Sequence, residues 1–88
     1  MTATDAYFKT VWNNLIPKTV KTLIESSITY GSFKAYVYKS ISPDAFYDID
    51  LYVKYLEKLG YDVTVENLSV NGTPDVKLTI SWDLETMI

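Results

Sequence analysis

The clearest alternation of apolar and polar positions lies in the C-terminal half of the chain. Residues 61–66 and 75–82 each place an apolar side chain at every second position, which is the period of a half-buried β-strand. The segment between them is rich in turn-forming residues, and Asn71-Gly72 is its expected tip. We therefore predict two strands paired as an antiparallel hairpin.

Residues 43–59 instead carry the three- and four-residue spacing of a helix. Ser42 is a good N-cap, Pro43 suits the first turn, and Gly60 supplies a left-handed stop. Acidic side chains near the start complement the positive end of a helix dipole. We predict one continuous helix whose core stripe comprises Phe46, Ile49, Val53 and Leu56.

The N-terminal half begins with a helical pattern over residues 4–27. Pro17 interrupts it, because proline lacks the backbone N–H that a helix interior requires. The pattern predicts either one helix kinked at Pro17 or two short helices split near Asn13-Asn14, with their apolar residues on the same face. Gly31 ends this segment, and residues 33–39 then alternate as a strand.

These elements predict one α+β domain over residues 1–88, in the order α-β-α-β-β. We expect a two-layer α/β sandwich, with two helices on one face of a three-stranded sheet and a C-terminal hairpin. The first two strands could be neighbours joined by a right-handed parallel crossover. The expected core comprises Phe8, Trp12, Leu15, Val20, Leu23, Phe33, Val37, Phe46, Ile49, Val53, Leu56, Val63, Val65, Leu78, Ile80 and Trp82.

The helix at residues 43–59 is apolar over more of its circumference than one core face needs. At about 100° per residue, Tyr47, Leu51 and Tyr55 lie away from its core stripe. On the first strand, Tyr36 and Tyr38 occupy the face opposite the expected core. Such surplus apolar side chains tolerate solvent, or the N-terminal segment covers those on the helix, or a partner covers them. We interpret the five residues as a protein-binding site.

Composition narrows the chemistry, because the chain has no Cys, His, Arg or Gln. The usual general base and the commonest metal ligands are therefore missing. Asp48 and Asp50 resemble a metal motif in the text, yet on one helix their carboxylates point about 200° apart. We predict no enzyme activity, no cofactor, no metal and no small-molecule substrate. The net charge of −3, with every positive charge on Lys, disfavours nucleic acid as the main partner.

Charge is unevenly divided along the chain. Residues 1–41 hold five Lys against Asp5 and Glu25, a balance of +3, whereas residues 42–88 have a balance of −6. This is either chance or a basis for head-to-tail self-association. The N-terminus lacks the basic start and apolar run of a signal peptide, and no stretch is long and apolar enough for a membrane span. We expect a location inside a cell or packaged inside a particle, and ends of the chain that pack, for instance on a neighbouring subunit.

A resemblance to known proteins indicates where this chain comes from. The helix end Leu56…Gly60-Tyr61, the strand with Val63 and Val65, and the closing Ile80-Ser81-Trp82 are similar to a group of small uncharacterised proteins of tailed bacteriophages. The likeness covers roughly residues 15–83, and the longer loop NLSVNGTP and the tyrosine content depart from it. It implies a phage origin, and with it a location in the virion or in the host cytoplasm, and supplies no activity and no site residues.

Our main hypothesis is a non-enzymatic structural or accessory protein that self-associates or docks on a larger assembly. The alternative is a small acidic inhibitor of a host enzyme or defence complex, suggested by the acidic residues after position 41. That version requires Asp44, Asp48, Asp50, Glu57 and Asp62 to cluster in space.

Overall fold

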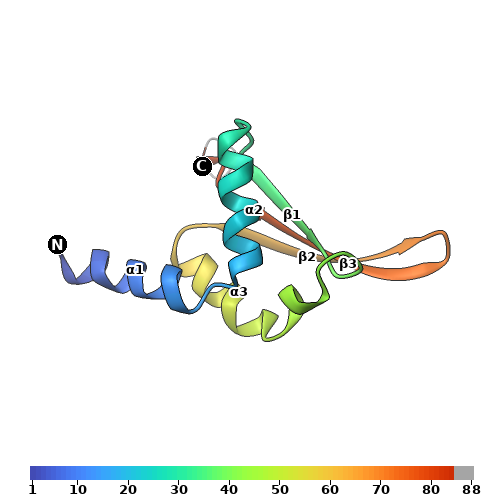
Figure 1. Cartoon of the computed structure of the whole chain (residues 1–88), viewed down its shortest axis with the longest axis horizontal. Helices are drawn as coiled ribbons and strands as arrows, with labels where there is room; N and C mark the ends of the chain where they lie inside the picture. Colours follow the sequence, from blue (N-terminus) through green and yellow to red (C-terminus); the bar gives the residue numbers. More distant parts are fainter. Residues whose placement is uncertain (85–88) are drawn as a thin grey trace.

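The computed structural model describes residues 1–84 as an elongated α+β protein of 50 × 28 × 22 Å (Figure 1). The α+β class and the C-terminal hairpin are confirmed, and the observed order agrees with the expected one once the interrupted helices are taken into account. The end of the C-terminal tail, residues 85–88, lies outside the described residues. The elements are α1 Ala3–Asn14, α2 Lys18–Thr29, β1 Lys34–Tyr38, the 3-10 helix η1 Pro43–Phe46, α3 Ile49–Lys58, β2 Asp62–Val70 and β3 Thr73–Ser81.

The sheet has the order β1-β3-β2, and both strand pairs are antiparallel. β3 is the last strand in the chain but the central strand in the sheet. It pairs Leu78 with Val37 on one side and with Val65 on the other. The parallel crossover considered for the first two strands is therefore absent, because β3 separates them.

The β2–β3 hairpin is longer than its alternation pattern indicated. Both strands continue through the polar stretch between them and meet at Asn71-Gly72, where both residues have positive φ. Two residues with positive φ match the twist of the flanking strands, so the turn holds the register without a longer loop. The hairpin extends beyond the helices at one end of the molecule (Figure 1).

Two separate helices replace the expected segment 4–27, as the second alternative proposed. α1 ends at Asn14 and α2 starts after Pro17. The prediction that both helices turn one apolar face to the core is wrong for α1. This helix extends away from the body (Figure 1), and only Val11 in it is buried. Phe8 is consequently exposed, although its side chain fits the helical pattern.

The continuous helix expected over residues 43–59 is also wrong. The chain forms η1, turns at Tyr47-Asp48, and begins again as α3. Asp48 adopts a left-handed conformation with φ of 53°, which Asp tolerates better than most residues. Ser42 precedes η1, but its side chain makes no capping hydrogen bond.

The core lies between the helices and one face of the sheet. Ala35 and Val37 of β1 share that face with Leu78 and Ile80 of β3, and all four are buried. α2 packs against β1, and α3 packs against β2. The description of the whole as a two-layer sandwich stays a prediction. The buried apolar residues are Val11, Ile16, Val20, Ile24, Ala35, Val37, Ala45, Tyr52, Leu56, Leu78 and Ile80.

Three other residues expected in the core are exposed. Leu15 lies in the break between α1 and α2, and Phe33 precedes β1. Val65 is on the core face of β2, but its side chain remains half exposed. Trp12, Leu23, Phe46, Ile49, Val53, Val63 and Trp82 are partly buried against the core. Within residues 1–84, no helix has the length and apolar character needed to cross a membrane.

Candidate functional site

The five residues predicted to bind a partner lie in three different places. Tyr47 and Leu51 line one hollow at the start of α3. Tyr55 is instead partly buried against the core, and the Lys58 ammonium lies 5.8 Å from its ring centroid. Tyr36 and Tyr38 are on the sheet face opposite the core. The sequence therefore grouped side chains that the fold separates.

The hollow beside Tyr47 and Leu51 has a volume of about 320 Å³. Leu15, Ile16 and Pro17 form its other wall, so the break between α1 and α2 faces the break between η1 and α3. Three large apolar side chains at this hollow are exposed: Tyr47 by 76%, Leu51 by 54% and Leu15 by 42%. An exposed apolar cluster of this kind is typical of a contact surface.

A buried hydrogen bond fixes the shape of this hollow. The Tyr52 hydroxyl donates to the backbone oxygen of Ala45 at 2.5 Å, which joins α3 to η1. Both residues are buried, and burial raises the pKa of Tyr52 to about 12. An unbroken helix would place residues 45 and 52 about 10.5 Å apart along its axis. The turn at Asp48 therefore allows this bond to form.

The open sheet face combines tyrosines with charged and hydroxyl side chains. Tyr38 lies opposite Lys77 in the register, and Lys77 in turn lies opposite Glu66. The Lys77 ammonium is 4.5 Å from the centroid of the Tyr36 ring, a cation–π contact. This contact gives Tyr36 a partner within the chain, so its exposure alone is weaker support for a binding role.

An aromatic cluster that includes Trp12 and Trp82, both predicted to lie in the core, is only partly buried. The Trp12 and Tyr61 rings stack with centroids 6.2 Å apart, and Tyr61 meets Trp82 edge-on at 6.1 Å. Burial raises the pKa of Tyr61. Shallow hollows flank the cluster beside Phe8 and Leu59 on one side and Ile28 on the other. Alternation over residues 75–82 correctly predicts Trp82 on the core side, where it is partly buried, but alternation does not show that the core ends there.

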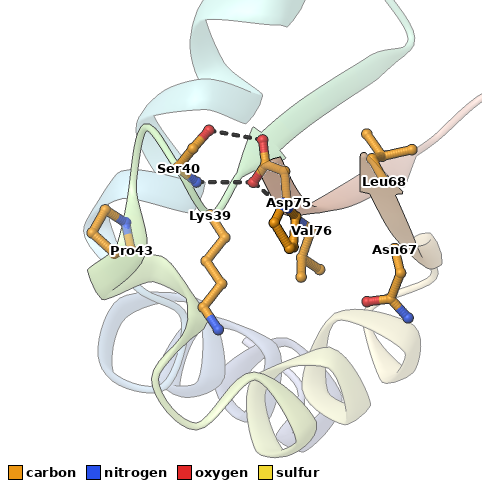
Figure 2. A pocket seen from close by; sticks show the side chains of 8 residues that line it. Lys39, Ser40, Pro43, Asn67, Leu68, Asp75 and Val76 are labelled. Atoms are coloured by element: carbon orange, nitrogen blue, oxygen red, sulfur yellow. Dashed lines mark hydrogen bonds between the residues drawn. The ribbon is translucent and has the colours of Figure 1, made fainter. Parts of the chain in front are cut away.

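A larger hollow, of about 570 Å³, lies between the end of β1 and the hairpin (Figure 2). Figure 2 shows Asp75 turned toward Ser40, whose hydroxyl donates to the carboxylate at 2.7 Å. The backbone N–H groups of Ser40 and Val76 donate to the same carboxylate at 3.0 and 2.8 Å. These hydrogen bonds lower the pKa of Asp75, and the bond from the Ser40 hydroxyl has the largest effect. The carboxylate is thus engaged in holding the hairpin to the end of β1.

Acidic side chains form no metal centre in the described part of the chain, where no three of them are placed to hold an ion. Asp48 and Asp50 no longer share one helix, since Asp48 lies in the turn before α3. Within α3, Asp50 and Glu57 alternate with Lys54 and Lys58 along the sequence. The helix surface therefore carries both signs of charge.

Comparisons with protein-family models, with curated proteins and with solved structures found no match to this chain.

Proposed function

We propose that this chain is a non-enzymatic, phage-type structural or accessory protein that acts through protein–protein contacts. The single observation that carries the proposal is the hollow lined by Tyr47 and Leu51, where three large apolar side chains are exposed together. Removing such side chains from water stabilises a complex by about 25 cal/mol per Å² of apolar surface, before the costs of association. The phage origin rests on the resemblance at the end of α3 and in the closing strand.

The construction of this hollow supports a docking role. Its walls are held by the Tyr52–Ala45 hydrogen bond on one side and by Pro17 on the other. A preformed apolar surface loses little conformational freedom when a partner binds, which favours affinity. Tyr47 also offers a hydroxyl at the edge of the apolar area, a combination that interfaces favour. We infer that a larger assembly docks at this hollow.

Particle association tests the proposal. The tagged chain is produced during infection by the phage that carries its gene, and purified virions are analysed by quantitative mass spectrometry. We expect the wild-type chain to copurify with virions and Leu51→Asp to reduce its amount at least tenfold, because a carboxylate would be desolvated in the contact. Ile41→Asp is the matched control, since Ile41 is 76% exposed and lines none of the hollows described above.

Two results would contradict this function. One is a wild-type chain that is absent from virions and remains monomeric in sedimentation at high concentration. The other is an equal loss for Leu51→Asp and Ile41→Asp, which would mean that the hollow has no special role. Circular dichroism of both variants checks that each one folds.

The alternative, an acidic inhibitor, has less support. It required the acids after position 41 to form one cluster, yet Asp50 and Glu57 share α3 with Lys54 and Lys58. No observation in the described residues favours it over the docking role.

A further inference from the structure

The two edges of the sheet differ in how their backbone groups are used. Trp82 N–H donates to Phe33 O, and Lys39 N–H donates to Val76 O, so Phe33, Ala35, Val37 and Lys39 face β3. The residues between them point their backbone groups outward from β1. By the same alternation, β3 uses its odd-numbered residues to pair with β2. The outward backbone groups of β2 therefore belong to Val63, Val65, Asn67 and Ser69.

The β1 edge is largely closed by the chain itself. The Ser32 hydroxyl bonds both backbone groups of Lys34, accepting from its N–H at 3.2 Å and donating to its carbonyl at 3.0 Å. The carbonyl of Tyr38 accepts from the N–H groups of Ile41 and Ser42. Beyond the end of β1, the next outward position of β3 is Pro74, which has no N–H. Such features prevent another strand from pairing there.

The β2 edge has none of these protections. It is nine residues long and contains no proline or lysine. Within residues 1–84 no hydrogen bond to the outward backbone groups of Val63, Val65, Asn67 or Ser69 is present beyond the sheet ladder. Val65 is also 50% exposed on the core face, although it lies opposite the fully buried Leu78. One open edge beside one closed edge directs strand addition to β2.

We propose that the β2 edge pairs antiparallel with β2 of a second copy, which joins two sheets in the order β1-β3-β2-β2-β3-β1. The occupant is a second copy because the strand is complementary to itself. A two-fold axis at Val65 places Val65 against its own copy, and Thr64 then lies opposite Glu66 and Asp62 opposite Leu68. The pairing thus covers the half-exposed valine and sets no like charges directly opposite each other.

Other registers of this pairing are poorer. An axis at Glu66 sets two glutamates directly opposite each other in the closely spaced, non-hydrogen-bonded position. An axis at Asn67 avoids that repulsion but pairs Val65 with Ser69, so no valine–valine contact forms. With the axis at Val65, the start of each β2, where α3 packs, lies beside the end of the partner strand that extends beyond the helices.

This pairing rests on the proposed function and deepens it, since a second copy of the chain is one possible protein partner. It uses a surface other than the Tyr47–Leu51 hollow.

Single-cysteine crosslinking tests the register directly, because the chain has no native cysteine. At the axis, the two Cα atoms of Val65→Cys should lie about 5.5 Å apart, within the range that a disulfide spans. The two copies of Asn67→Cys should be about 14 Å apart, which no disulfide bridges. Val70→Cys is the matched control for random collision, since its side chain is exposed but far from the axis.

We expect mild oxidation to convert most Val65→Cys protein to a covalent dimer, at least tenfold more than Asn67→Cys or Val70→Cys. In sedimentation of the unmodified chain, the average mass should rise toward twice the monomer mass with concentration. Asn67→Pro should remain monomeric with an unchanged circular dichroism spectrum, because its N–H makes no bond to β3. Equal crosslinking of all three variants, preferential crosslinking of Asn67→Cys, or a wild-type chain that stays monomeric would overturn the proposal. None of these results alters the virion test of Leu51→Asp.

Discussion

The hydrogen bond between Tyr52 and Ala45 gives the sharpest stability prediction. Tyr52→Phe keeps the ring but removes the hydroxyl, and the buried Ala45 carbonyl loses its donor from that side chain. A buried polar group left without a partner costs about 1–3 kcal/mol. We therefore expect the free energy of unfolding to fall by about 2 kcal/mol at pH 7. That is a large share of the roughly 4–13 kcal/mol expected for a chain of this length.

Urea unfolding measures this change, with Trp12 and Trp82 as fluorescent probes next to the core. Tyr30→Phe is the matched control, because the Tyr30 side chain is exposed and its hydroxyl makes no hydrogen bond within residues 1–84. The control should unfold at the wild-type urea concentration. If Tyr52→Phe and Tyr30→Phe are equally stable, the bond does not join η1 to α3 as described.

Alkaline pH adds an independent test of the same group. Burial raises the pKa of Tyr52 from 10.0 to about 12, so the folded state retains this proton more strongly than the unfolded state. The resulting stability is fully present below pH 10 and is lost as pH rises toward 12. At pH 11 the wild type should have lost about 1.4 kcal/mol that Tyr52→Phe does not lose. The difference between the two proteins should therefore narrow between pH 9 and 11, and a constant difference would refute a buried Tyr52.

Three further changes test other parts of the fold by urea unfolding. Asp48→Ala should destabilise by about 1 kcal/mol because alanine resists positive φ, whereas Asp48→Gly should be at least as stable as the wild type. Asp75→Asn should lower the urea midpoint at pH 7. Because the pKa of Asp75 is lowered, its carboxylate stabilises the fold above about pH 4, and the difference in midpoint between wild type and Asp75→Asn should disappear as pH falls further. Val11→Ala should cost about 2 kcal/mol and Phe8→Ala less than about 1 kcal/mol, and the reverse order would show that α1 buries Phe8 and not Val11.

Local patterns predicted the elements better than their arrangement. Pro17 and Asn71-Gly72 act through their own backbone preferences, so their positions could be read directly from the chain. Asp48 has no such signature, because the turn there depends on burying Ala45 and Tyr52 together. The strand order could not be predicted either, since alternation shows that a strand has a buried face but not which strand lies beside it.

In the candidate site, too, local patterns predicted some residues correctly and missed others whose position depends on how the elements are arranged. One continuous helix over residues 43–59 predicts Tyr47 and Leu51 away from the core, and both are exposed although that helix is broken. The same pattern predicts Tyr55 away from the core, yet Tyr52 is buried and Tyr55 packs, partly buried, against the core. Leu15, the third exposed apolar residue of the hollow, was assigned to the core because the angle between α1 and α2 is not encoded in helical spacing.

The central place of β3 has a consequence for the order in which the chain can fold. Strand β1 must wait for residues that are synthesised much later, since Tyr38 pairs with Lys77 and Lys34 with Ser81. The hairpin closes over far shorter separations, beginning with Val70 and Thr73, and short loops cost less entropy to close. A nascent chain that stops before residue 73 has no strand pairing of this sheet at all, because β1 and β2 never pair with each other.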